Sequence, residues 1–149
     1  MKFSTRTQYG LKAILVLAGR FGEGLLSVSA IAKKESISVH YLEQILNALK
    51  KKGLVKSVRG PQGGYALAKK PSEVTLHDLY TALETRKDKP RPALGPEADE
   101  TALADAIFWN KFASSVEKGL SELTLKDLVD EARRIKKGKS RTPAGTFHI

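Results

Sequence analysis

Three polar side chains suited to reading nucleotide bases lie close together in this sequence. Gln44 and Asn47 carry amides, which can pair with the edge of adenine, and Glu43 carries a carboxylate, which can accept from the amino group of cytosine. A carboxylate beside phosphates is repelled unless it meets a donor, so Glu43 favours discrimination between bases. A surface ion pair of Glu43 with Lys50 or Lys51 is the alternative interpretation.

The residues at the start of the same segment are suited to contacting phosphates. Free amide groups at a helix start and nearby hydroxyls favour phosphate contact, which points to Ser38, His40 and Tyr41. His40 is equally consistent with a solvated surface histidine, and Tyr41 with a core residue. Four residues near the amino terminus are expected to contact the DNA backbone, positioning the protein rather than specifying a sequence: Lys2, Ser4, Thr5 and Tyr9.

A glycine-rich turn forms the second candidate surface. Glycines allow a positive φ and a close approach of the backbone to a phosphate, and a proline stiffens the bend. An arginine just before such a turn is placed to enter the minor groove of A·T-rich DNA. A plain tight hairpin is the alternative. The candidate contacts here are Arg59, Gly60, Pro61, Gln62 and Gly63.

The elements that must position these side chains form a mainly α-helical fold with a small β-hairpin. Leu42, Ile45, Leu46 and Leu49 follow the i, i+3, i+4, i+7 spacing of one helix face, leaving the polar side chains outward. A short helix capped by Ser27 or Ser29 precedes this helix, so the pair predicts a helix-turn-helix, and the hairpin after it predicts a winged helix. We expect helices over 4–20, 30–35, 39–52, 76–84 (opened by a cap at Thr75), 98–120 and 125–135, and strands over 54–59 and 65–68.

The chain divides into three parts by composition. Residues 1–85 are predicted to form the winged helix-turn-helix DNA-binding domain, and 86–97, with three prolines, a flexible loop. Residues 98–149 are predicted to hold a long dimerisation helix, a short helix and a basic tail that is mobile from Lys136. Packing of the long helix back onto its own domain is the alternative to dimerisation.

The net charge of +10 is confined to the first half of the chain. Residues 1–70 hold thirteen basic and three acidic side chains, whereas residues 71–149 hold thirteen of each. This asymmetry favours a polyanionic partner for the first half, such as double-stranded DNA. Uneven solubilising charge is the alternative.

Several classes of function are disfavoured by what the sequence lacks. The chain has no cysteine, which removes disulfides, thiolate nucleophiles and cysteine-ligated metals. The three histidines have no ligand spacing and no Ser-His-acid or phosphate-loop arrangement stands out, so we expect neither metal nor catalytic residues, and no enzyme. No apolar run reaches the roughly 18 residues of a membrane span. With no signal peptide visible at the start, we expect a soluble cytoplasmic protein without a membrane role.

Taken together, MKFSTRTQYGLKA, SVHYLEQ, GLVKSVRGPQGGYALAK and TLKDLVD resemble the Rrf-two family of bacterial transcription regulators. The resemblance covers nearly the whole chain. The family includes iron-sulfur cluster regulators, nitric-oxide-sensing repressors and repressors of cysteine metabolism. The resemblance implies a dimeric winged-helix DNA binder whose long carboxy-terminal helix pairs the two subunits.

The chain departs from the family in one respect. Many members place three cysteines in the loop before the dimerisation helix, where they ligate an iron-sulfur cluster, whereas residues 86–97 here contain none. The sequence is therefore similar to the cluster-free branch typified by the cysteine-metabolism repressor. That likeness implies no cofactor and regulation by a partner protein or a small-molecule effector, although a cluster held by other ligands stays open.

These observations lead to an expected function. We expect a sequence-specific repressor that binds an imperfect palindrome as a homodimer, with half-sites about 10 base pairs, or a multiple, apart. A global regulator controlled by a metabolite in the dimer interface is an alternative within this class. A winged-helix module that binds acidic protein or RNA, without selective DNA binding, is the alternative from a different class.

Overall fold

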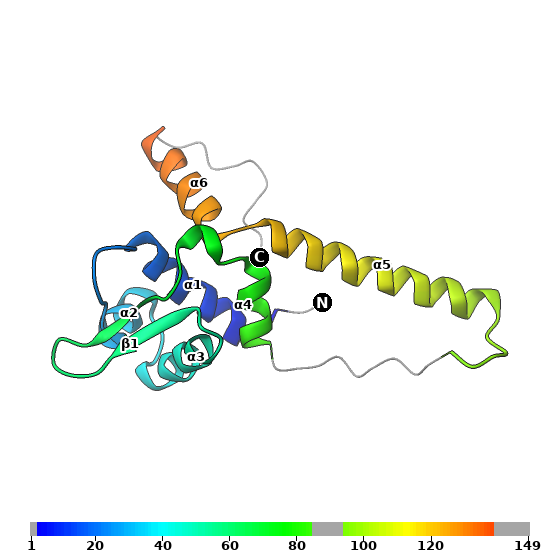
Figure 1. Cartoon of the computed structure of the whole chain (residues 1–149), viewed down its shortest axis with the longest axis horizontal. Coiled ribbons are helices and arrows are strands. Elements are labelled where there is room, and N and C mark those ends of the chain that lie inside the picture. The colour runs from blue at the N-terminus through cyan, green and yellow to red at the C-terminus, as the bar shows by residue number, and fades with distance from the viewer. Residues whose placement is uncertain (1–2, 85–93, 139–149) are drawn as a thin grey trace.

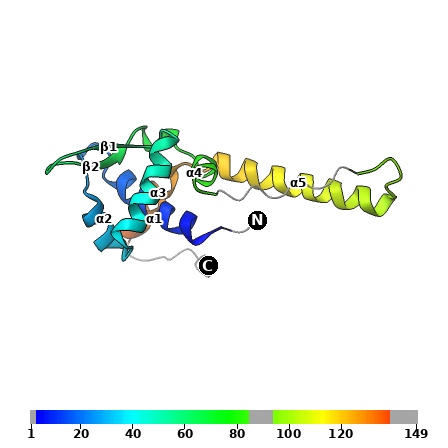
Figure 2. The same cartoon turned by 90° about the horizontal axis from the view of Figure 1, so that it is seen from below.

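The computed structural model describes residues 3–84 and 94–138, and three helices open the chain (Figures 1 and 2). Each begins at a serine whose Oγ accepts a hydrogen bond from the backbone N–H three residues on, at 3.2 Å in all three cases. Such a cap satisfies an amide that has no partner within the helix. The three helices are α1 (Thr5–Gly19) after Ser4, α2 (Val28–Glu35) after Ser27 and α3 (Val39–Lys51) after Ser38.

The predicted helix-turn-helix is confirmed in α2 and α3. Ser36 adopts the left-handed conformation, with φ of 54°, and ends α2 three residues before α3 begins. The apolar face of α3 is fully buried, so the opposite face is held outward along the whole helix. Ser27, and not Ser29, provides the cap of α2.

The predicted hairpin is also present. Strands β1 (Val55–Val58) and β2 (Gly64–Leu67) pair antiparallel, with Ser57 opposite Tyr65 and Lys56 opposite Ala66. Neighbouring residues of a strand point to opposite faces, so these two pairs face opposite sides of the hairpin. Leu26 exchanges two backbone hydrogen bonds with Tyr65, of 2.9 and 2.8 Å, which attach the hairpin to the segment before α2.

The second part of the chain is joined to the first through two matching helix starts. Thr75 caps α4 (Leu76–Leu83) and Thr124 caps α6 (Leu125–Lys137), each in a capping box with an aspartate three residues on. The backbone N–H of Leu76 donates to the carbonyl of Leu123, and that of Leu125 to the carbonyl of Val74, both at 2.9 Å. These bonds hold the start of α6 against the start of α4. A short 3₁₀ turn, η1 (Pro71–Glu73), which the sequence analysis did not predict, precedes α4.

Helix α5 (Glu100–Glu122) extends away from the other elements (Figures 1 and 2). None of its residues is buried. Its carboxy-terminal half lies near α4, where Nε2 of His77 and Oε1 of Glu117 are 3.6 Å apart. Its amino-terminal half projects into solvent, so α5 packs back onto its own domain through its carboxy-terminal half alone.

The core is one cluster formed by α1, α2, α3, α4, the hairpin and the start of α6. Gly10 lets α1 approach α4, because a Cβ at this position would lie 2.1 Å from Cδ1 of Leu83. Helix α6 continues through Lys136 to Lys137, so the predicted tail starts later than expected, since basic side chains are favourable in a last helical turn. The predicted mobility of residues 139–149, and that of 86–93 in the loop, lies outside the described residues. No helix within 3–84 and 94–138 has the length and apolarity needed to span a bilayer.

Candidate nucleic-acid interface

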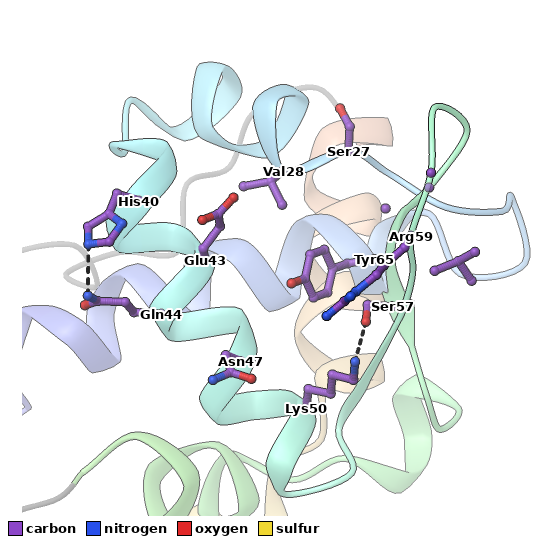
Figure 3. A pocket seen from close by; sticks show the side chains of 14 residues that line it. Ser27, Val28, His40, Glu43, Gln44, Asn47, Lys50, Ser57, Arg59 and Tyr65 are labelled. Atoms are coloured by element: carbon purple, nitrogen blue, oxygen red, sulfur yellow. Dashed lines mark hydrogen bonds between the residues drawn. The ribbon is translucent and has the colours of Figure 1, made fainter.

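A groove of about 570 Å³ separates α3 from the hairpin and contains the three residues predicted to read bases, Glu43, Gln44 and Asn47 (Figure 3). One wall is the outward face of α3, and the other is the groove-facing side of β1, β2 and their turn. The start of α2 closes one end, with Ser27 and Val28. Helix α3 contributes His40, Glu43, Gln44, Asn47 and Lys50, and the hairpin contributes Ser57, Arg59, Gly60, Gly63 and Tyr65, among others.

The α3 wall follows directly from helix periodicity. His40, Glu43, Gln44 and Asn47 are three or four residues apart, so they form one exposed stripe opposite the buried leucine and isoleucine face. Nε2 of Gln44 lies 3.2 Å from Nε2 of His40. An amide NH₂ group only donates, so this bond needs an unprotonated Nε2 on His40. The Gln44 side chain is thus partly oriented before any ligand arrives.

Glu43 carries the acidic charge in this groove. It is exposed, and among the described residues it forms no ion pair, so the alternative pairing with Lys50 or Lys51 is absent. Lys50 instead donates from Nζ to Oγ of Ser57 at 2.6 Å, which links the end of α3 to β1 (Figure 3). This bond joins the two walls near the end of α3, and sequence reasoning did not find it.

The hairpin wall ends in a tight turn that requires glycine. Gly60 has a φ of 119°, and the N–H of Gly63 donates to the carbonyl of Gly60 at 2.9 Å. A Cβ on Gly63 would lie 2.1 Å from the carbonyl oxygen of Val58. The alternative, a plain tight hairpin, is therefore enough to explain why glycines stand at these positions. Pro61, Gln62 and Arg59 are all exposed at this tip, so they remain accessible to a ligand.

The aromatic candidates, Tyr9 on α1 and Tyr41 in the first turn of α3, lie outside the groove. The rings of Tyr9 and Tyr41 meet edge to face with centroids 5.8 Å apart, and both side chains are partly buried against the core. Lys12 places Nζ 5.9 Å from the centre of the Tyr9 ring. Each tyrosine is thus both a packing residue and accessible at the start of α3, next to the capping Ser38.

The amino-terminal candidates differ in their availability. Thr5 is exposed, and Lys2 lies outside the described residues. The hydroxyl of Ser4 is engaged within the protein, because it donates to Oε1 of Glu84 at 2.7 Å and accepts from the N–H of Thr7. The hydroxyl of Thr7 donates to the same Oε1 at 2.5 Å. Glu84, eighty residues away in sequence, therefore fixes the start of α1.

Sequence reasoning missed several groove residues, among them Ser57 and Tyr65. These two are cross-strand partners that face α3. Strand alternation from the turn would have identified them, since Arg59 and Ser57 are two residues apart. With Lys50 and Arg59 as cations and Glu43 as the anion, the lining combines charge attraction with polar groups able to distinguish ligands.

Comparison with known proteins gives consistent matches. Residues 3–131 match the Rrf2 family, described as an iron-dependent transcriptional regulator. The HTH-type transcriptional regulator CymR of Bacillus subtilis (strain 168) is 38% identical over 128 residues, covering 86% of this chain and 89% of the relative. The HTH-type transcriptional regulator IscR of Photorhabdus laumondii subsp. laumondii is 33% identical over 153 residues, covering 97% and 93%. The solved structure of CymR (YrzC), the global cysteine regulator of B. subtilis, has a TM-score of 0.73 at 37% identity and covers 88% of this chain and 98% of its own.

The residues of this chain do not fit a cysteine-ligated iron site. The sequence contains no cysteine, so no thiolate is available to hold iron or a cluster. Within residues 3–84 and 94–138, no three histidine, aspartate or glutamate side chains are grouped as metal ligands. The description of the family as iron-dependent therefore has no cysteine to match it in this sequence, and no grouped ligands among the residues that the structure describes.

Proposed function

This chain belongs to the Rrf2 family of transcriptional regulators, and we propose that it is a homodimeric repressor that reads a palindromic operator. Its relatives are DNA-binding regulators and not enzymes. The observation that carries the proposal is the groove between α3 and the hairpin, whose walls present base-reading side chains and an exposed arginine. In this proposal, residues 1–85 form the DNA-binding unit, and 98–149 join two copies.

Helix α3 would enter the major groove with its exposed stripe toward the bases. Its 13 residues are about 20 Å long, and a major groove about 12 Å wide accepts a helix. Gln44 and Asn47 would contact adenine, while Glu43 would accept from cytosine and oppose bases that offer only acceptors. His40 orients Gln44 by their hydrogen bond.

Contacts to the phosphates and to the minor groove would come from the two sides of α3. Arg59, exposed at the tip of the hairpin, would insert into the minor groove beside the half-site. The Gly60–Gly63 turn would approach a phosphate with its backbone. Thr5 and Ser38 would contact the sugar-phosphate backbone, as would Tyr41 through its accessible part. Ser4 is better suited to holding α1 in place than to contacting DNA, because its hydroxyl bonds Glu84.

Dimerisation through α5 is supported by apolar surface that one copy leaves exposed. Leu103, Ile107 and Phe108 are 46%, 54% and 58% exposed on its projecting half. Phe108, Trp109 and Phe112 form an aromatic cluster with ring centroids 5.1 to 6.2 Å apart. An exposed apolar patch of this kind marks an interaction surface.

A second copy offers a place for this half-helix. An apolar groove of about 220 Å³ lies where α1, α4 and the end of α5 meet, lined by Phe3, Leu11, Leu79, Tyr80 and Leu120, among others. In a twofold dimer with antiparallel α5 helices, the projecting half of each would lie over this groove of the other copy. The two α3 helices of the dimer would then face the same side of a DNA duplex, about one helical turn of the DNA, or a multiple of it, apart.

Regulation would come from outside this chain. Because the chain offers no thiolate, control by a partner protein or a small-molecule effector is the proposal that its composition supports. We expect the regulator to act in the cytoplasm, where the bacterial chromosome lies.

The test is selection of duplexes from a random pool with the wild-type protein, followed by titration of the selected site with two variants. Gln44→Ala should relax the base preference at one position of each half-site, because binding to the duplex with the preferred base should weaken by about 1–3 kcal/mol. Arg59→Ala should reduce the preference for A·T pairs flanking the half-site. Selection that yields no motif, with RNA or acidic protein bound as tightly as DNA, would favour an interaction module instead.

A further inference from the structure

A second surface surrounds the carboxy-terminal end of α1, where three adjoining grooves share residues. One, of about 320 Å³, lies between Leu15 of α1 and Leu128 and Ala132 of α6. Another, of about 310 Å³, lies between Phe21, η1 and α6. The third, of about 450 Å³, lies between Phe21 and the side of the hairpin that carries Ala66. We call this the Phe21 surface, defined by Leu15, Phe21, Ala66, Leu128, Val129 and Ala132.

The Phe21 surface is apolar at its centre. The Phe21 side chain is 48% exposed, although it follows a helix that is otherwise well packed. Val129 lines two of the grooves and is only partly buried. The surface is hollowed rather than protruding, which favours side chains of another protein over insertion into a lipid layer.

The rim of the Phe21 surface is cationic. Lys56, Lys70, Arg133 and Lys136 line the grooves, and none of them is in an ion pair with a described residue. Arg133 is held in place, because Nη2 donates to the carbonyl of Gly19 at 2.9 Å. The two other lining cations, Arg20 and Lys126, already have carboxylate partners, Glu23 and Asp130.

Most of the Phe21 surface lies away from the DNA-reading groove, and the two share one lining residue, Val58 at the end of β1. Helix α6 is on the side of α1 opposite to α3 (Figure 1). Lys56 and Ala66 face the other side of the hairpin from Ser57 and Tyr65. The projecting half of α5 also points away from it (Figure 1). The surface therefore stays accessible when α3 is in a major groove.

We propose that the Phe21 surface binds an acidic amphipathic helix of another protein. Apolar side chains at i, i+3, i+4 and i+7 of that helix would fill the grooves, and its carboxylates would pair with the four cations of the rim. A second copy of this chain is disfavoured as the occupant, because the acidic amphipathic helix that it offers, α5, is used in the dimer proposed above and projects away from this surface (Figure 1). The last eleven residues of the chain contain no Asp or Glu either, so they do not supply the complementary charge.

The test uses a labelled 18-residue peptide with leucines on one helical face and glutamates on the other, titrated by anisotropy with the full-length protein. Phe21→Ser should weaken binding about tenfold by removing the central apolar contact. Lys70→Glu/Lys136→Glu should weaken binding by about tenfold or more through repulsion. Lys34→Glu, a charge reversal on α2 outside this surface, should change binding less than twofold. Phe21→Ser should leave DNA affinity unchanged, which shows that the variant is folded.

Several results would overturn this proposal. If a scrambled peptide of the same composition binds equally well, the surface attracts the peptide through charge alone and does not recognise an apolar helix face. Equal binding by the wild-type protein and both surface variants would place the peptide elsewhere. If the variants instead weaken self-association, duplex binding or binding to phosphatidylglycerol vesicles, the occupant is a second copy, DNA or a lipid surface.

Discussion

The apolar half of α5 gives a prediction whose magnitude comes from its exposure. Ile107 and Phe108 are 54% and 58% exposed in one copy. Complete burial of such a side chain stabilises by about 1.5–3 kcal/mol, so covering the exposed part is worth about 0.8–1.6 kcal/mol each. A twofold dimer contains each residue twice. The Ile107→Ala/Phe108→Ala variant should therefore weaken the dimer by roughly 3–6 kcal/mol, which is about 10² to 10⁴ in the dissociation constant.

Sedimentation velocity over a range of protein concentrations measures this dissociation constant. The control is Lys111→Ala/Lys118→Ala, which truncates two exposed polar side chains of the same helix and should leave the dimer intact. Because α5 has no buried residue, both variants should keep the helical content of the wild-type protein by circular dichroism, which shows that the fold is intact. Dimerisation through α5 would be refuted by a wild-type protein that is monomeric at micromolar concentration, or by a dimer that Ile107→Ala/Phe108→Ala leaves unchanged.

Three other predictions concern the hairpin turn, the packing of α1 against α4, and the capping box that opens α6. Gly63→Ala must open the hairpin turn, and loss of one or two backbone contacts should weaken operator binding about tenfold in an anisotropy titration, with helical content unchanged by circular dichroism. Gly10→Ala should lower stability by about 1–3 kcal/mol in denaturant unfolding, because its Cβ meets Leu83, whereas Gly19→Ala, with open space around it, should be nearly neutral. The backbone N–H of Thr124 holds the pKa of Asp127 below its ordinary value, so this carboxylate stabilises the fold above the ordinary pKa and the benefit is lost as pH falls through its lowered pKa. Thermal melts should thus show Asp127→Asn less stable than wild type at pH 7, with the gap closing as the pH falls below the ordinary pKa of a carboxyl group; a gap independent of pH would contradict this.

Local patterns in the sequence were sufficient to predict the helix and the hairpin that form the groove. The leucine and isoleucine spacing of α3 predicted both its buried face and its exposed stripe. The β-branched run before the glycine-rich turn predicted the hairpin, since few other structures suit glycine at consecutive tight positions. Repetition of the Thr-Leu-X-Asp-Leu pattern at 75–79 and 124–128 was visible too, but not that the two helix starts would be joined by backbone hydrogen bonds.

Contacts between distant residues were not predictable in this way. Ser4 was a candidate DNA contact until Glu84 proved to occupy its hydroxyl, because nothing in local spacing brings residue 84 to the start of α1. The bond from Lys50 to Ser57 likewise depends on how the hairpin folds back. The Phe21 surface combines α1, α6 and the hairpin, so it exists only in the folded chain.

The central claim, selective reading of DNA by the groove between α3 and the hairpin, is tested most directly by one titration. The purified wild-type protein is titrated by anisotropy against its selected duplex and a scrambled duplex of the same length at several salt concentrations. We expect the protein to bind the selected duplex about 10³-fold or more tightly than the scrambled duplex near physiological salt, while binding to the scrambled duplex weakens as the salt concentration rises. Equal binding of the two duplexes, fading together with salt, would contradict it.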